Sequence, residues 1–470
     1  MAKETLNRGS IGFWGVVFIS MVAIFPANIY IISSTTALTY AGEAAPLTFI
    51  IGTALMFLNV IAVYIFSTKI VNAGGYYKFV EKATGNTVLS RSTAWIQFIA
   101  QMGPVIISAT VFGWLIPVTA SALFGVTLPF WVPFVASFLV LLYVFLISYF
   151  GVKLSTRISI VIGILEIVFV LAAGIYIVSH TQYNSLGTFN IKNSSGGIDG
   201  FFVGMVTGPL TAYIGYSAVV QFSEEAKFSK TVMKKAIVTS ILIAAVFETF
   251  MMYSITVGTS PSHLAALSSS YAPALVLTRD YMGLGFALTV LIVALLGQIT
   301  SPLTFGNSAS RVVYALGRDK IFPESFAKVH KKYKSPVIAI TFVFIFAVIA
   351  SVITQAFMVY RFGVLTGMFD AIVFWSIILT FTNLLYHAIV NQSLPFLMKK
   401  LKQLNVVKHI VAPTVGTITI FIIFYYTFLG IALPIAYDIP VIIVWILIGI
   451  FVAYRKRHVA ISNEDMGDSI

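Results

Sequence analysis

The stretch TGPLTAYIGYSAVVQFSEEAK, residues 207–227, decides the fold because it is apolar enough for a membrane span yet unsuited to an unbroken α-helix. Gly208, Pro209 and Gly215 interrupt it within eight residues. Proline removes one backbone donor and clashes with the preceding turn, and glycine weakens the helix that remains. Inside a bilayer, the freed amides and carbonyls are tolerated only where protein or a wet cavity surrounds them. The stretch therefore predicts an interrupted span at a substrate site, with a proline kink in a packing helix as the alternative.

The composition places the whole chain in a bilayer. Of its 470 residues, 59% are hydrophobic and 10% are charged, and the mean hydropathy is +0.97, which is too apolar for a soluble protein. The net charge is +13, but the basic residues lie in short clusters between apolar runs, which argues against a nucleic-acid-binding face. The chain has no cysteine, no Walker-type loop and no metal-binding motif. We therefore expect no enzyme activity and no cofactor.

Twelve apolar runs are long enough to cross the hydrocarbon core, which needs about 20 residues of helix. They cover residues 12–35, 47–68, 92–122, 129–150, 156–178, 199–223, 233–258, 282–312, 336–356, 361–386, 408–430 and 433–454. The predicted fold class is an all-α polytopic membrane protein. The loops between the runs reach only about twenty residues, too few to build a soluble domain.

The distribution of Lys and Arg orients these spans. If the N-terminus is cytoplasmic, all but three of the 29 basic residues fall on cytoplasmic segments, the exceptions being Lys192, Arg279 and Arg361. The positive-inside rule then supports twelve spans with residues 1–11 and 455–470 both in the cytoplasm. We expect the plasma membrane as the location, and the chain carries no indication of its oligomeric state.

The first span is also interrupted, at AIFPA, residues 23–27. Pro26 is suited to the first turn of a second half-helix, where its missing amide costs nothing. The interrupted spans 1 and 6 each begin a group of five, and they cross the membrane in opposite directions. This layout predicts an inverted repeat, residues 12–178 against residues 199–386, followed by two further helices in residues 408–454.

Three motifs resemble the amino acid, polyamine and organocation (APC) superfamily. AGGYY, residues 73–77, resembles its Gly-Gly-x-Tyr signature after span 2, and FSEEAK, residues 222–227, is similar to its acidic pair after span 6. SRVVYALGRDKIFP, residues 310–323, resembles the run that ends span 8 in the family. The resemblance covers roughly residues 10–390. Three motifs in order, each at the matching loop, argue against coincidence.

Two features depart from the family pattern. Span 1 lacks the glycine-rich break that is common in the family, and residues 21–26 stand there instead. At the Gly-Phe-Glu position of many members, this chain has Gly215, Tyr216 and Ser217. The specificity that the acidic residue supports in relatives therefore does not transfer.

The resemblance implies a LeuT-type fold and a secondary permease for amino acids or related amines. A broken helix offers amides to a carboxylate and carbonyls to an ammonium group, so both interruptions are expected to contact the substrate. The expected substrate-binding residues are Val22, Ala23, Ile24, Phe25, Pro26, Ala27, Asn28, Thr211, Ala212, Tyr213, Gly215, Tyr216 and Ser217. Tyr213 or Tyr216 would form an aromatic lid, although packing is the more common role of a tyrosine.

Ionisable residues inside spans are the candidates for energy coupling. Glu166 lies mid-span in ILEIVFVL, near the position where some proton-coupled members carry a lysine. Because burial favours the neutral form of a carboxyl, Glu166 is the first candidate proton carrier, and a structural carboxyl that bonds a neighbouring helix is the equal alternative. Glu248 and Asp370 rank below it.

Two further groups of polar residues are candidates with an ordinary alternative. Thr300, Ser301 and Thr304 in span 8 would coordinate sodium, or bond their own helix. Four charged residues would latch a cytoplasmic gate, or form a solvated face. These gating candidates are Glu224, Glu225, Arg311 and Arg318.

The predicted function is secondary active transport of amino acids by alternating access, with proton symport as the favoured mode. Exchange, sodium symport and transport of a polyamine or another organic cation are the alternatives. A dication would call for several carboxylates at the site, which favours neutral or weakly polar amino acids. A channel or receptor is disfavoured, because the sequence shows neither a filter repeat nor a sensory domain.

Overall fold

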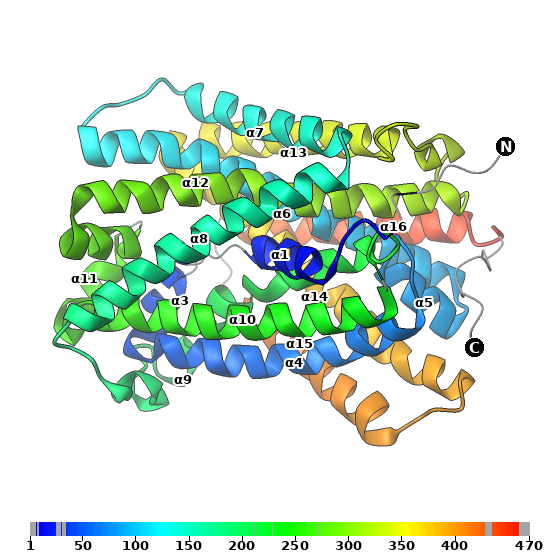
Figure 1. The fold of residues 1–470 in the computed structure, drawn as a ribbon, viewed down its shortest axis with the longest axis horizontal. Coiled ribbons are helices and arrows are strands. Elements are labelled where there is room, and N and C mark those ends of the chain that lie inside the picture. The colour runs from blue at the N-terminus through cyan, green and yellow to red at the C-terminus, as the bar shows by residue number, and fades with distance from the viewer. Residues whose placement is uncertain are drawn as a thin grey trace.

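A computed structural model describes residues 6, 9–24, 30, 34–210, 212–227, 229–270, 272–427 and 435–459. Figure 1 shows long helices running roughly side by side, with the helix that contains residues 13–24 near the middle of the view. Within the described ranges the chain forms no strand beyond one isolated bridge, between Ile11 and Ala226. The all-α membrane class predicted from the sequence is confirmed.

The α-helices follow the apolar runs of the sequence. Their bounds are α1 Phe13–Ile24, α3 Ser34–Ala41, α4 Ala45–Lys69, α5 Tyr76–Thr84, α6 Thr87–Phe124, α7 Val132–Tyr149, α8 Val152–His180, α9 Gly197–Met205, α10 Ser229–Val257, α11 Leu264–Ser268, α12 Pro273–Arg318, α13 Val337–Phe362, α14 Val364–Lys400, α15 Ala412–Thr427 and α16 Asp438–Arg455. A π-helical turn, η5 (Val206–Leu210), and a 3-10 helix, η6 (Tyr213–Phe222), follow α9.

Eleven segments of the described chain are long and apolar enough to cross a membrane, and α1 is a shorter apolar helix of 12 residues. Each of the eleven coincides with one of the predicted spans 2–12. The second half of the predicted first span includes residues 25–29 and 31–33, which lie outside the described residues. These segments are helical because the hydrocarbon core contains no water to bond the backbone, so each amide must be hydrogen-bonded within its own segment.

Two predicted boundaries were wrong. The span predicted at 282–312 belongs to α12, which begins at Pro273 and changes direction at Gly283, whose φ is 82°. The helix that contains the span predicted to end at 386 is α14, which continues to Lys400. Hydropathy detects only the part of a helix that lies in hydrocarbon, so it misses helical turns that continue beyond it.

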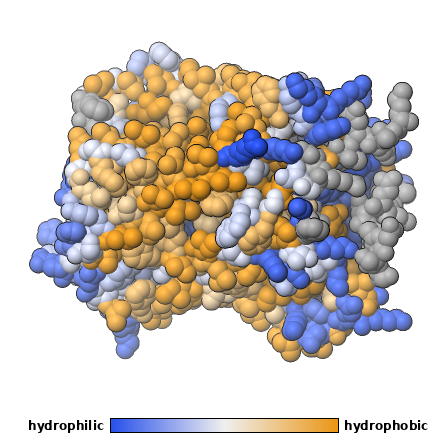
Figure 2. Space-filling model, in the orientation of Figure 1, coloured by the Kyte–Doolittle hydropathy of each residue, from blue (hydrophilic) through white to orange (hydrophobic). Residues whose placement is uncertain are grey.

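Charged residues gather at the ends of the helices. We call the basic end the end of the bundle at which α4 finishes in Lys69, α12 in Arg318, α14 in Lys400 and α16 in Arg455. It lies at the right of Figure 1. Figure 2 shows a broad hydrophobic band between hydrophilic ends, as expected for helices that cross a bilayer.

Candidate functional site

The interruption of span 6 follows from its sequence. After α9 the backbone widens into the π-helical turn η5, which contains Pro209, and then tightens into η6. A proline inside a helix removes one hydrogen bond of the ladder, and short π and 3-10 segments are common where the α-helical ladder is disturbed. The predicted departure from an α-helix is confirmed, although the second half is a 3-10 helix.

The interrupted part of span 6 is in direct backbone contact with α1. A Cβ atom on Gly215 of η6 would lie within 3.0 Å of the carbonyl group of Ala23 and of the nitrogen of Ile24, both on α1. No side chain fits in that space, so glycine permits the approach. Val22, Ala23 and Ile24 are all buried. The structure thus brings the predicted residues of α1 together with Gly215.

Tyr213 points from η6 toward helices α4 and α10. Its side chain is fully buried, and its hydroxyl lies 2.8 Å from Oγ1 of Thr53 on α4. The carboxyl of Glu248 on α10 lies beside the same hydroxyl. From the sequence, Glu248 ranks below Glu166 as a proton carrier, because no local pattern indicates that its carboxyl lies beside a residue of the interrupted span.

Tyr216 and Ser217 pack against α14. The Tyr216 ring lies 5.7 Å from the ring of His387, and the Ser217 hydroxyl accepts from the Tyr386 hydroxyl at 3.0 Å. Asn383 Nδ2 also donates to Ser217, at 3.2 Å. This side of η6 is therefore held in place by polar contacts from one helix.

Glu166 lies where α8 meets α1 and α12. Its side chain is 1% exposed, and its carboxyl occupies the space that a Cβ on Gly297 of α12 would fill. One turn earlier on α8, Gly163 faces Val22 of α1. The hydroxyl of Thr300 donates to the carbonyls of Leu296 and Gly297 of its own helix.

The neighbouring hydroxyls of α12 differ from Thr300. Ser301 and Thr304 are buried, and the Ser301 hydroxyl makes no hydrogen bond to the described residues. Thr300 therefore bonds its own helix, which is the alternative to sodium binding. The Ser301 hydroxyl does not, within the described residues.

The four gating candidates form two ion pairs at the basic end. Arg311 pairs with Glu225, and both side chains are almost fully buried. Arg318 pairs with Glu224 at 3.0 Å, and the same carboxyl accepts from the backbone amide of Ala73 at 2.7 Å. Burial raises the pKa of Glu225, and the nearby Arg311 guanidinium opposes that rise.

A third buried group of charges belongs to α5. Lys78 is fully buried and pairs with Asp319 at 2.6 Å and with Glu81 at 2.9 Å. The Tyr77 hydroxyl donates to Asp319 at 2.9 Å. Burial raises the pKa of Glu81, and Lys78 opposes that rise. Sequence reasoning missed Lys78, although its i,i+3 spacing from Glu81 on an amphipathic segment was a visible signal.

We refer to these charges together as the ion-pair cluster. Its members are Lys78, Glu81, Glu224, Glu225, Arg311, Arg318 and Asp319. Beside it, the backbone amide of Ile11 donates to the carbonyl of Glu225 at 3.1 Å, and the amide of Lys227 donates to the carbonyl of Ile11 at 2.8 Å. This backbone tether joins the segment before α1 to the segment after η6.

A family model described as amino acid permease matches residues 11–452. The chain belongs to the amino acid permease family. The resemblance to the APC superfamily is thereby confirmed, and the permease is a multi-pass membrane transporter and not an enzyme.

Curated relatives of the permease differ in the substrates that their names state. It is 23% identical over 360 residues to the branched-chain amino acid permease BcaP of Bacillus subtilis (strain 168), covering 72% of this chain and 73% of the relative. It is 22% identical over 348 residues to the aspartate-proton symporter of the same organism, covering 72% and 65%. It is 22% identical over 356 residues to the low-affinity putrescine importer PlaP of Escherichia coli (strain K12), covering 74% of each chain.

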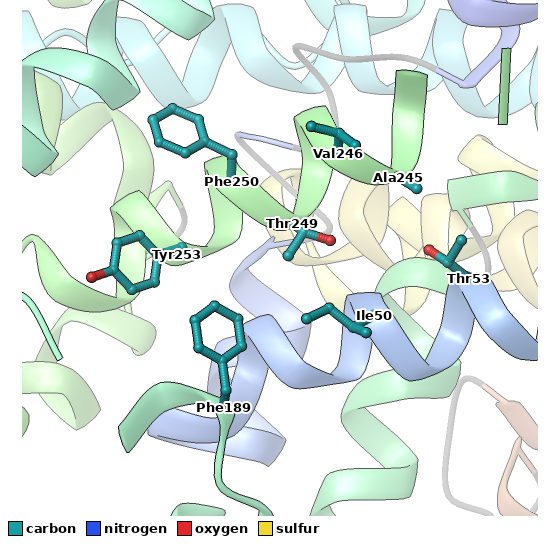
Figure 3. Close-up of a pocket in the computed structure, with 8 residues that line it drawn as sticks. All are labelled: Ile50, Thr53, Phe189, Ala245, Val246, Thr249, Phe250 and Tyr253. Atoms are coloured by element: carbon teal, nitrogen blue, oxygen red, sulfur yellow. The ribbon is translucent and has the colours of Figure 1, made fainter. Parts of the chain in front are cut away.

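A groove of about 460 Å³ lies between α4 and α10 of the permease and is drawn in Figure 3. Its lining residues are Ile50, Thr53, Phe189, Ala245, Val246, Thr249, Phe250 and Tyr253. Because Val246 is 73% exposed, the groove opens on the outer surface of the bundle. None of the expected substrate-binding residues lines it, so it is not the predicted site.

Part of the predicted site lies outside the described residues. These residues are Phe25, Pro26, Ala27, Asn28 and Thr211. Ala212 is described and is 9% exposed. Substrate binding by the expected residues therefore stays a prediction, and for the second half of span 1 so does their position.

Proposed function

We propose that this permease carries amino acids or related amines across the membrane by alternating access, with the substrate bound beside the contact of Gly215 with Ala23. That contact supports the proposal most strongly, because it brings the interrupted part of span 6, which has backbone groups outside the α-helical ladder, against Ala23 and Ile24, where the sequence predicts the interruption of span 1. The freed amides would bind the carboxylate of the substrate and the freed carbonyls its ammonium group. A LeuT-type arrangement of two inverted repeats follows from the same proposal.

The favoured cargo is a neutral or weakly polar amino acid. The described residues at the contact, Val22, Ala23, Ile24 and Gly215, carry no charge, and so offer nothing to a second charged group of a substrate. Relatives named for branched-chain amino acids, aspartate and putrescine keep an amine or organic cation as the alternative cargo.

Proton symport is the proposed mode, with Glu166 as the proton carrier. Support comes from the position of Glu166 at the junction of α1, α8 and α12, where movement of α1 would change its surroundings. Sodium bound by Thr300, Ser301 and Thr304, or exchange of one amino acid for another, are the alternatives.

The ion-pair cluster is proposed as the gate on the cytoplasmic side of the plasma membrane, with both termini on that side. Its buried pairs join α5, α12 and the segment after η6, so they must separate if a path opens there. The same end carries the clustered basic residues, which the positive-inside rule assigns to the cytoplasm.

The deciding experiment is uptake of a labelled amino acid mixture into proteoliposomes under an inward proton gradient. It is repeated with sodium and with preloaded amino acids, for the wild type and Glu166→Gln. We expect accumulation in the wild type, and counterflow without accumulation in the variant. Absence of uptake of any amino acid by folded, oriented protein would contradict the cargo, and unchanged accumulation in the variant would remove Glu166 from the mechanism.

A further inference from the structure

A second intramembrane carboxyl lies beside the proposed substrate site. The side chain of Glu248 on α10 is 1% exposed. Neither of its oxygens has a hydrogen bond of standard geometry to the described residues, and the group beside them is the hydroxyl of Tyr213. Tyr213 lies two residues before Gly215, which contacts α1. Glu248 therefore lies beside a side chain of the interrupted part of span 6, that of Tyr213.

The helix register places Glu248 beyond Ile24, the last described residue of α1. Helices α1 and α10 both begin near the backbone tether and run in the same direction. The Ser20 hydroxyl of α1 bonds the Ser240 hydroxyl of α10 at 2.8 Å. At about 1.5 Å per residue, Ile24 lies about 6 Å beyond that bond and Glu248 about 12 Å beyond it. Glu248 thus lies past the described end of α1.

No cation faces Glu248 within the described parts of the elements that pack against α10. These elements are α1, α3, α4, α8, α12 and η6. Their titratable and charged residues, with those of α10, are Tyr40, Tyr64, Lys69, Lys153, Arg157, Glu166, Tyr176, His180, Tyr213, Tyr216, Lys230, Lys234, Lys235, Tyr253, Arg279, Asp280, Tyr281, Arg311, Tyr314 and Arg318. Of these residues, Tyr213 is the one whose side chain interacts with the carboxyl of Glu248.

An enclosed carboxyl without a cation is stable only in its neutral form, because an unpaired buried charge is strongly unfavourable. The two oxygens are sealed from solvent, so the only cation that fits against them in this conformation is a proton.

We propose that Glu248 is a proton-binding site beside the interruption of span 6 and that Tyr213 covers it. The inference that follows for transport rests on the proposed function. When η6 moves and takes Tyr213 with it, the carboxyl meets the substrate path and its proton passes to water there. Substrate binding and protonation of Glu248 are then linked, because both depend on the position of Tyr213.

The first test is infrared spectroscopy of the purified permease, which needs no substrate. A protonated carboxyl has a carbonyl stretching band that a carboxylate lacks. We expect the difference between wild type and Glu248→Gln to contain this band at neutral pH. Glu324→Gln is the matched control, because Glu324 is 70% exposed and its carboxyl is solvated. A difference spectrum without the band would overturn the proposal.

The second test is the half-saturating substrate concentration in proteoliposomes as a function of pH. In the wild type we expect it to change by up to about tenfold per pH unit where Glu248 titrates, and we expect Glu248→Gln to lose this step while keeping any pH dependence that Glu166 contributes. Glu248→Asp should restore a pH dependence. A wild-type profile in Glu248→Gln would refute the link between Glu248 and transport.

A third variant covers the case in which Glu248→Gln does not fold. Tyr213→Phe removes the neighbouring hydroxyl but retains the ring, so it should shift the pH midpoint of the infrared band. An unshifted midpoint would contradict the role of Tyr213 as the cover. If the wild type transports neither amino acids nor amines, the proposed function fails, and the infrared result still decides whether Glu248 holds a proton.

Discussion

At the scale of single residues, Gly215 is a position where one added carbon atom would meet the backbone of another helix. Any Cβ there would lie within 3.0 Å of the α1 backbone. We predict that Gly215→Ala pushes α1 and η6 apart, lowers the free energy of unfolding by about 1–3 kcal/mol and abolishes uptake. Thermal unfolding in detergent and proteoliposome uptake measure the two effects.

The control for Gly215→Ala is Gly285→Ala. A Cβ on Gly285 of α12 meets nothing within 4 Å, and its φ is not positive. This variant should be as stable and as active as the wild type. If Gly215→Ala is as stable and as active as Gly285→Ala, the contact between α1 and η6 does not constrain transport.

The buried carboxyls of the ion-pair cluster predict a pH dependence with a definite sign. Burial raises the pKa of Glu81 and of Glu225. Once an open gate brings them to water, their pKa values fall toward the ordinary range, so the closed gate binds protons more tightly. Acid on this side therefore stabilises the closed gate, and that stabilisation is lost as the pH rises through the raised pKa values.

This sign can be measured by cysteine labelling, since the native chain has no cysteine. Ser308 is fully buried, one turn before Arg311 on α12. We expect the labelling rate of Ser308→Cys, divided by that of the exposed Lys331→Cys, to fall as the pH drops from about 7 to about 5. A ratio that rises would show that protonation opens the gate.

The sequence indicates which residues interrupt a span, but it does not indicate which residues of other segments they contact. Pro209 and Gly215 indicate an interruption from the sequence alone, because their effect is local. That Gly215 meets Ala23, or that Tyr213 meets Glu248, depends on how distant segments pack, and no local pattern encodes it.

At the scale of elements, α5 is joined to the residue that follows α12 through one lysine. Lys78 is fully buried between two carboxyls. Removing one partner of a buried pair leaves an uncompensated charge, which costs about 3–5 kcal/mol. We predict that Lys78→Met destabilises the permease by about that amount, and that adding Asp319→Asn recovers a substantial part of the loss.

A double-mutant cycle in thermal unfolding tests this prediction. Lys320→Met is its control, since the pair of Lys320 with Glu324 is about 70% exposed on both sides and contributes about 0–1 kcal/mol. Additive effects of Lys78→Met and Asp319→Asn would mean that the two side chains do not stabilise each other.

The short amphipathic segment of α5 was predictable from the sequence, whereas its burial was not. A charged residue is expected at the solvent-exposed surface, and the burial of Lys78 is compensated by its ion pairs with Asp319 and Glu81. The break after α9 was predicted, but its π and 3-10 geometry was not, because these forms depend on packing against α1 and α4.

At the scale of the whole molecule, the proposed orientation predicts which surfaces are reached from outside the cell. Lys192 lies in a loop assigned to the outside and Lys331 in one assigned to the cytoplasm, and both are exposed. We expect Lys192→Cys to react with a membrane-impermeant maleimide in intact cells and Lys331→Cys to react only after permeabilisation. The opposite pattern would invert the topology and move the gate to the outer surface.

Fold class and span positions were the best predicted features of the molecule. Eleven predicted spans correspond to helices because hydrocarbon leaves a long apolar segment few alternatives. The ends of α12 and α14 were mispredicted because helices continue into water wherever neighbours support them. The inverted repeat is a hypothesis about symmetry, which apolar content alone does not determine.

The backbone tether between Ile11 and the segment after η6 bears on how the family diverges. Its two hydrogen bonds use amides and carbonyls only, so almost any amino acid at these positions preserves them. Proline at either donor, Ile11 or Lys227, is the exception, because it has no N–H to give. We therefore expect homologues to retain this joint between the segments next to α1 and η6 without sharing any residue there, provided that neither donor position is a proline.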